Sequence, residues 1–591
     1  MTDTATEIVA NPKAARRAGL IRLATGLVQG VLLYALYEAS ERKVWPSNTP
    51  MLFAALALAA MYAPFVVLAG ASSLRPRTLI GWTAAAVLLA AGLTAYDIWT
   101  VPHFMGGRDV VRNLPDGSVF CAVAALLFIG HHLVQPADME RRPIARFATY
   151  FDVTWKHGVQ LALSLLFTGA FWLLLFLAGQ LFKLIGIDAI ERLIREEAFS
   201  FPATTVMFAA AVQLTDVRAN LVRGVRTVSL TLLAWLLPLM VLIAGGFLLS
   251  LPFTGLAPLW ATRKAAALLL TAAAFLIVLT NAAYQDGAER PSPVLAWAAR
   301  IAGLLLAPIT ALAAYAVWLR VAQYGLTPER VYGLACIVVA VGYAVGYAIA
   351  AVRPGAWMKP LETTNIAMAF ATVGVLLALF TSLADPRRVS VSDQVSRLER
   401  GAVKAETFDF DFLRFGSARF GREALDRLKT SADPKIAELA KASATRSEPL
   451  PRGDRPVDTP PDIVFHPAGT PAPDGFLTRV EPRRRYDTCF GGDGQKCDAR
   501  LLDVTGDGRP EVLLSSAWSI EVYAQDADGG WRRLGQFTQS CGSFDAREAI
   551  REGRLSTAAP AVSDLVGPRG AMRFEWQDQG CPPQVKPPQK P

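Results

Sequence analysis

The sequence has few charged residues and few histidines for its length, and each shortage excludes a class of protein. Charged side chains make up 18% of the 591 residues and hydrophobic ones 52%, which excludes a soluble globular, fibrous or disordered protein of this size. Only five histidines are available for a metal centre. HExxH, GxSxG, P-loop and Rossmann glycine motifs are also absent. The sequence therefore favours a membrane protein that is not an enzyme.

Apolar runs of about 20 residues, the length that crosses a bilayer, recur between Ala18 and Ala384. They predict about eleven transmembrane helices, near residues 18–39, 51–72, 79–97, 118–135, 158–186, 199–215, 227–251, 265–285, 293–319, 330–352 and 363–384. The sixth is the weakest, because it is short and contains Pro202. The expected fold is an all-α polytopic membrane bundle followed by a small α+β, β-rich exported domain.

The positive charges of the chain indicate its orientation. Lysine and arginine are more frequent in the N-terminal segment and in alternate loops after it, which predicts a cytoplasmic N-terminus. An odd number of spans then places the residues after Ala384 on the opposite side. The net charge of +9 is thus explained by topology and contact with membrane lipids, and no nucleic-acid partner is expected.

Composition divides the chain into five parts. We predict a cytoplasmic N-terminus at 1–17, a helical bundle at 18–385, a helical juxtamembrane segment at 386–446, a Pro-rich linker at 447–462 and a β-rich periplasmic module at 463–591. The juxtamembrane segment is expected to contain one helix from Glu406 to Leu428 with an aromatic stripe. This stripe either packs against protein or contacts lipid or a partner.

Four of the six cysteines lie in the terminal module, which agrees with an exported location because disulfides persist outside the cytosol. They are Cys489, Cys497, Cys541 and Cys581. Four cysteines allow three pairings. The short loop from Cys489 to Cys497 favours a local disulfide, which leaves Cys541 for Cys581.

The terminal module reads as two strand–turn–strand units, with strands at 499–502, 511–515, 520–524 and 531–537. The first turn carries oxygen ligands at alternate positions, on Asp503, Thr505, Asp507 and Glu511. Such a set suits calcium, and the loop resembles the calcium loops of FG-GAP and VCBS repeats. The alternative is an Asp/Gly-rich hairpin turn that binds no metal, and structural calcium is the only cofactor that the sequence suggests.

Polar side chains at membrane depth are costly unless they face a cavity or a partner. The sixth span ends in Gln213 and Asp216, and the eighth in Asn281, Tyr284, Gln285 and Asp286. The spacings i, i+3 and i, i+4 place members of each set on one helix face. These residues either form a polar pocket between the two helices or cap helix ends beside headgroup water.

Two other features of the spans are weaker signals. His131 and His132 close the predicted fourth span, and neighbouring residues on a helix point about 100° apart, so we expect interfacial polar residues rather than ligands. Gly26 with Gly30, and Gly342 with Gly346, have the GxxxG spacing of closely packed helices.

Three segments resemble a known family. ATTVMFAAAVQLTDVR (203–218), AAAFLIVLTNAAYQDG (272–287) and FDFDFLRFGSARFGREAL (408–425) are similar to bacterial multi-pass inner-membrane proteins catalogued as domain of unknown function 4153. The resemblance implies a place in the bacterial inner membrane and brings no reaction or ligand.

These features are compatible with two functions. The first is transport, or lipid and envelope handling, with a periplasmic accessory domain and a small molecule as partner. The alternative is a non-enzymatic envelope sensor or scaffold, whose bundle anchors a periplasmic module that recognises an envelope protein.

Overall fold

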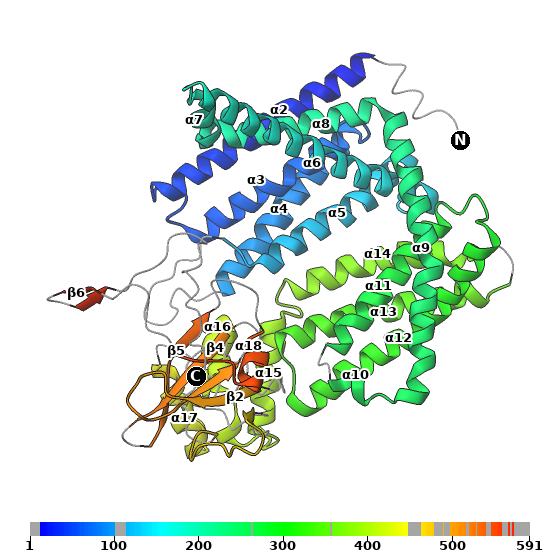
Figure 1. Cartoon of the computed structure of the whole chain (residues 1–591). Helices are drawn as coiled ribbons and strands as arrows, with labels where there is room; N and C mark the ends of the chain where they lie inside the picture. Colours follow the sequence, from blue (N-terminus) through cyan, green and yellow to red (C-terminus); the bar gives the residue numbers. More distant parts are fainter. Residues whose placement is uncertain are drawn as a thin grey trace. The chain divides into compact units, whose positions relative to one another are not determined.

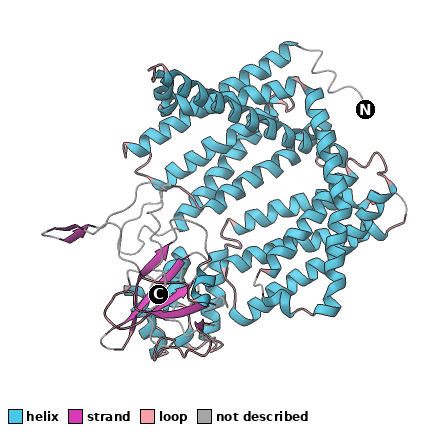
Figure 2. Ribbon diagram, viewed as in Figure 1, coloured by secondary structure: helices cyan, strands magenta, loops and turns pink. Residues whose placement is uncertain are grey.

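The computed structural model describes residues 12–100, 114–261, 264–354, 357–446, 463–477, 489, 497–515, 519–526, 529–538, 545–557, 565–567 and 570–572. The chain divides into two compact units, Met1–Ser447 and Glu448–Pro591. Figure 2 shows a first unit made of helices and a second that contains the strands. The predicted linker at 447–462 lies outside the described residues, as do Cys541 and Cys581.

Within the described part of the chain, eleven helices are long and apolar enough to cross a membrane. They are α2 (Pro12–Glu41), α3 (Pro50–Gly70), α4 (Pro76–Thr100), α5 (Gly117–Glu140), α6 (Phe147–Leu184), α8 (Glu197–Val217), α9 (Ala219–Thr254), α11 (Ala265–Tyr284), α12 (Pro293–Tyr324), α13 (Pro328–Val352) and α14 (Pro360–Leu379). The short helices α7 (Ala189–Arg195) and α10 (Ala257–Ala261) lie between spans. The predicted helical bundle is confirmed, and the doubtful sixth span is the full-length helix α8.

Successive spans cross the membrane in opposite directions, and this determines which helix ends lie on the same side. When all eleven helices cross, α3, α5, α8, α11 and α13 end on the side where α2 begins, which we call the N-terminal side. The residues after α14 then lie on the opposite side, which we call the tail side.

The spans form two groups, which Figure 1 shows in blue to teal (α2 to α8) and in green (α9 to α14). Each group contains a helix pair in close contact through glycine. A Cβ atom at Gly30 of α2 would lie 2.4 Å from Cα of Pro202 in α8, and one at Gly342 of α13 would lie 2.4 Å from Sδ of Met368 in α14. The close packing expected from the two GxxxG pairs is therefore present.

The juxtamembrane segment is helical but interrupted, so the prediction of one helix from Glu406 to Leu428 is wrong. It consists of α15 (Pro386–Glu399), a 3₁₀ turn η1 (Ala405–Thr407), a π-helical turn η2 (Phe412–Gly416), α16 (Ala418–Leu428) and α17 (Pro434–Thr445). The break falls at Ala418, which has φ +51°, a value outside the right-handed helical range. It lets α16 fold back so that Leu425 packs beside Phe408 in one buried core. The aromatic stripe thus packs against protein.

The second unit is built on a five-stranded sheet in the order β1-β2-β3-β4-β5. Its strands are β1 (Ile463–His466), β2 (Cys497–Leu502), β3 (Glu511–Ser515), β4 (Ser519–Gln525) and β5 (Trp531–Thr538), and it is accompanied by α18 (Ala546–Glu552) and a hairpin of β6 (Leu565–Gly567) and β7 (Gly570–Met572). The four predicted strands are confirmed to within two residues. Strand β1, which pairs with β2 in parallel, was not predicted, because its four residues carry too short a pattern.

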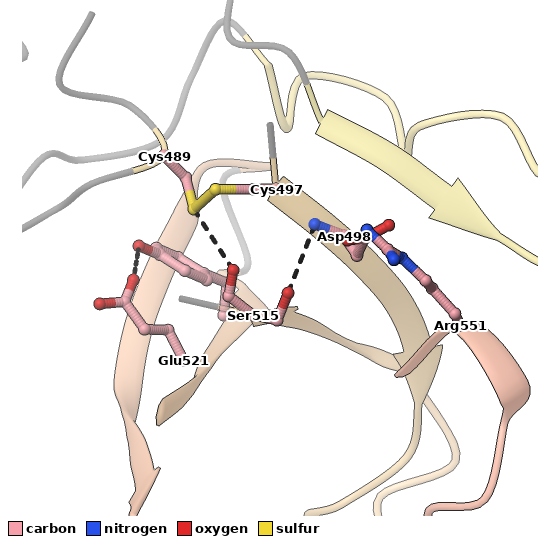
Figure 3. The surroundings of a disulfide bond; sticks show 7 residues. Cys489, Cys497, Asp498, Ser515, Glu521 and Arg551 are labelled. Atoms are coloured by element: carbon pink, nitrogen blue, oxygen red, sulfur yellow. Dashed lines mark hydrogen bonds and ion pairs between the residues drawn. A yellow bond between two sulfur atoms is a disulfide. The ribbon is translucent and has the colours of Figure 1, made fainter. Parts of the chain in front are cut away.

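Successive side chains of β3 point to opposite faces of the sheet, and each face has its own hydrophobic core. Val512 and Leu514 pack with Phe476 on one face, while Leu513 packs with Ile550 of α18 on the other. The predicted Cys489–Cys497 disulfide is present beside this sheet, close to Ser515 (Figure 3). It ties the segment before β2 to the sheet core.

Candidate functional site

A buried ionic cluster joins four helices at the N-terminal side of the first group. Arg22 of α2, whose side chain is 1% exposed, binds Asp216 of α8 at 2.9 Å, and Lys156 of α6 binds the other oxygen of Asp216 at 2.7 Å. Arg22 also donates to Gln213 Oε1 at 2.6 Å and to the Leu68 carbonyl of α3 at 2.9 Å. Gln213 and Asp216 thus share a face of α8 and bind groups on α2 and α6, while Arg22 connects the cluster to α3.

The residues predicted at the end of the eighth span make contacts within the second group. Asn281 of α11 donates to the hydroxyl of Tyr347 in α13 at 2.7 Å and accepts from Asn365 of α14 at 2.7 Å. Tyr284 donates to Glu362 of α14 at 2.9 Å. Gln285 is exposed at the end of α11, and Asp286 accepts from the Ala288 backbone N–H. The hydrogen bonds and ion pairs of these four residues share no residue with those of Gln213 and Asp216, so the structure does not bring the two sets into one site.

Three of the five histidines meet inside the first group. His131 and His132 of α5 and His157 of α6 have ring centroids 5.1 to 5.6 Å apart, and each is at most 7% exposed. His132 lies eight residues before Glu140 and His157 ten residues after Phe147, which places both about 12 to 15 Å from their helix ends. The structure thus brings the two neighbouring rings into one cluster, because α6 supplies the third ring. The expectation of interfacial polar residues rather than ligands stays a prediction.

Hydrogen-bond partners assign the protons of the three rings. His132 Nδ1 lies 2.6 Å from the Phe128 carbonyl, which can only accept, so His132 carries its proton there. Its Nε2 must then accept from Nδ1 of His157, 3.1 Å away. The indole of Trp82 can only donate, to His131 Nδ1 at 3.3 Å, and His131 Nε2 donates to Gln135 at 2.8 Å. If all three rings are neutral, Nε2 of His157 is the one ring nitrogen of this cluster that has neither a proton nor a hydrogen-bond partner.

This proton assignment does not suit a transition-metal centre. A zinc site needs three or four ligand atoms directed at one point, but both nitrogens of His131 and of His132 are engaged in hydrogen bonds. Only His157 offers a lone pair. The arrangement instead provides a fixed acceptor, because His132 accepts from His157 Nδ1 and holds that ring in place.

The histidines lie at the polar end of a cavity of about 580 Å³ between α3, α5, α6 and α8. The size is within the range of small-molecule pockets, roughly 300 to 1,000 Å³. Besides the three histidines and Gln160, its walls are apolar or aromatic: Tyr62, Phe65, Val66, Leu68, Ala69, Ala124, Ala125, Leu127, Phe128, Ile129, Leu161, Phe208 and Val212. Phe65, Phe128 and Leu161 are each about 40% exposed on the helix surface. The cavity is therefore lined in part by side chains that protein does not cover.

One sequence signal could have identified the histidine cluster. His132 and His157 stand at similar distances from the short connection between α5 and α6, and antiparallel helices joined by a short loop place such residues at the same depth. The partners of Asp216 gave no comparable signal, because Arg22 is 194 residues away in the chain.

The tail loop brings its acidic residues together. Oxygen atoms of Asp503, Asp507 and Glu511 lie within 4.8 Å of one another. The Thr505 hydroxyl donates to Glu511 at 2.9 Å, and both oxygens of Asp503 accept backbone N–H groups. These bonds shape the turn and leave further lone pairs on the carboxylates.

A second carboxylate of the tail is paired beside the disulfide (Figure 3). Burial alone would raise the pKa of Asp498, but hydrogen bonds from Arg551 and His466 outweigh it and hold that pKa below its ordinary value. The Arg551 pair at 2.8 Å fastens α18 to β2. We assign Asp498 a structural role.

Comparisons with known proteins gave one match. The family model described as "Domain of unknown function (DUF4153)" matches residues 51–430, which include most of the spans and the juxtamembrane helices up to α16. No curated protein and no solved structure matches the chain. The matched range contains the histidine cluster and the cavity, and the five-stranded sheet lies outside it.

Proposed function

The chain belongs to the DUF4153 family, and we propose that its membrane bundle binds and handles a lipid-like amphiphile in the bacterial inner membrane. The observation that carries the proposal is the cavity of about 580 Å³ with apolar walls and a histidine-lined polar end. An apolar chain can enter past Phe65, Phe128 and Leu161, which are exposed on the helix surface. Lipid or envelope handling explains such a cavity better than a purely anchoring bundle does.

The proposed orientation has a cytoplasmic N-terminal side and a periplasmic tail side. Two features support it. The cation-rich loops lie on the N-terminal side, and the Cys489–Cys497 disulfide belongs to the part of the chain beyond the last span, which agrees with an oxidising compartment. The tail then acts as a periplasmic accessory domain.

Filling the cavity tests the proposed function. Ala125→Trp places a large ring among the apolar walls and is expected to reduce the amount of lipid that co-purifies with the protein by several fold. Leu166→Trp is the matched control, because Leu166 is exposed on the surface of α6 outside the cavity. Native mass spectrometry of both variants in the same detergent measures the retained lipid. Equal retention in the two variants would show that the cavity holds no lipid.

Calcium in the tail loop is proposed as a structural accessory of the periplasmic domain. The three carboxylates within 4.8 Å of one another support it, because calcium prefers several oxygen ligands. We expect 1 mM calcium, compared with a chelator, to slow proteolysis of the tail in the full-length protein several fold, through mass action on the folded tail. Asp507→Asn should remove this protection, whereas Asp526→Asn, in the β4–β5 turn, should keep it. Equal proteolysis with and without calcium would identify the loop as a plain hairpin turn.

A further inference from the structure

We propose that the cavity selects an amphiphile whose polar end is a neutral hydroxyl group, which donates its one hydrogen bond to His157 Nε2 or to Gln160 Oε1. A diacylglycerol or a long-chain alcohol has this chemistry, and a phosphate headgroup does not. The inference rests on the proposed function, because it assigns the headgroup of the lipid-like ligand.

Two acceptors at the polar end of the cavity have no hydrogen-bond partner among the described residues. His157 and Gln160 stand at i, i+3 on α6, and both line the cavity. The side-chain N–H of Gln160 donates to the Val212 carbonyl at 2.9 Å, which fixes the amide orientation and leaves its oxygen free. Among the described residues, neither this oxygen nor His157 Nε2 has a hydrogen-bond partner.

Both side chains are largely enclosed by protein, so the two free acceptors depend on what occupies the cavity. His157 is 7% exposed and Gln160 4%, and both lie within the spans, where water is scarce. Neither acceptor is among the fully enclosed polar atoms without a partner, so each is reachable from the cavity, and an occupant that donates no hydrogen bond would cost it the bonds that water supplies. A hydroxyl group carries one O–H and restores such a bond at one of the two acceptors.

The described cavity walls offer no charged side chain to compensate a charged headgroup. The described walls of the cavity contain no arginine, lysine, aspartate or glutamate. The N–H groups of His131 and His132 at this end are already engaged with Gln135 and the Phe128 carbonyl. A phosphate would therefore meet two acceptor lone pairs and no positively charged side chain, and an ammonium group would lose its hydration without a counter-ion. A neutral hydroxyl group matches this end of the cavity better than either charged group.

A pair of lipids with identical acyl chains tests the proposal. We would add dioleoylglycerol and dioleoylphosphatidic acid in equal amounts to the full-length protein in detergent and measure the bound fraction of each by native mass spectrometry. The wild-type protein is expected to prefer dioleoylglycerol about tenfold, a typical effect of satisfying a buried acceptor. His157→Phe and Gln160→Leu should each reduce this preference. His157→Gln, which retains an acceptor, should preserve most of it.

A control variant distinguishes the loss of a headgroup contact from a general loss of structure. Gln29→Leu removes a similar buried amide of α2, which donates to the Ala60 and Met61 carbonyls outside this cavity, and should keep the wild-type preference. Equal binding of the two lipids by the wild type, or a preference for the phosphate, would overturn the proposal even if Ala125→Trp displaces both. If Ala125→Trp displaces neither, the proposed function fails as well.

Discussion

Asp216→Asn is expected to lower the free energy of unfolding by about 3 to 5 kcal/mol, the usual cost of removing one partner from a buried ion pair. The substitution keeps the size of the side chain and removes its charge. Arg22, 1% exposed, would remain buried without a counter-ion, and Lys156 would lose its bond at 2.7 Å. Thermal unfolding of the full-length protein in nanodiscs, followed by circular dichroism, measures the loss.

Two further variants separate the loss of charge from other effects. Asp188→Asn removes an exposed carboxylate that pairs with Arg192, and should change stability by no more than about 1 kcal/mol. The double variant Arg22→Met, Asp216→Leu removes both charges and should recover part of the loss of the single variant. If Asp216→Asn unfolds at the same temperature as Asp188→Asn, the buried cluster is not a determinant of stability.

Local pattern in the sequence predicted the elements of the fold far better than it predicted their contacts. The eleven spans were predictable because each is a continuous apolar run of membrane length, and four strands were predictable from short apolar runs between turns. The interrupted helix at Ala418 was not, because its apolar spacing continues across the break while the backbone changes its conformation there.

The candidate site was predictable only in part, because its contacts join residues that are far apart in the sequence. Gln213 and Asp216 were identified from their polarity at membrane depth, but their partner Arg22 was not, because it is brought close only by packing of α2 against α8. The same polarity argument included Asn281, which closes a separate network with Tyr347 and Asn365. Polarity at membrane depth identifies residues that need partners, and tertiary structure decides whether these partners are protein or ligand.

Packing of α2 against α8 holds the ionic cluster together, and Gly30→Ala is expected to weaken it. The added methyl group would lie 2.4 Å from Cα of Pro202 and 2.5 Å from Oγ1 of Thr205, distances that the fixed backbone of α8 cannot accommodate without moving. Overpacking of this kind costs about 1 to 3 kcal/mol. Gly92→Ala on α4 is the matched control, because nothing lies within 4 Å of its Cβ position, and it should be neutral or stabilise the helix by up to about 1 kcal/mol.

The double variant Gly30→Ala, Asp216→Asn connects this contact to the ionic cluster. Both substitutions act on the same pair of helices, because α8 carries Asp216 and α2 carries Arg22. If α2 must lie against α8 for Arg22 to reach Asp216, then the Gly30→Ala change already weakens the ion pair, and the second change costs less than it does alone. We therefore expect a combined loss smaller than the sum by about 0.5 to 3 kcal/mol, measured by thermal unfolding of the four proteins of the cycle. Strict additivity would mean that Arg22 reaches Asp216 independently of the glycine contact.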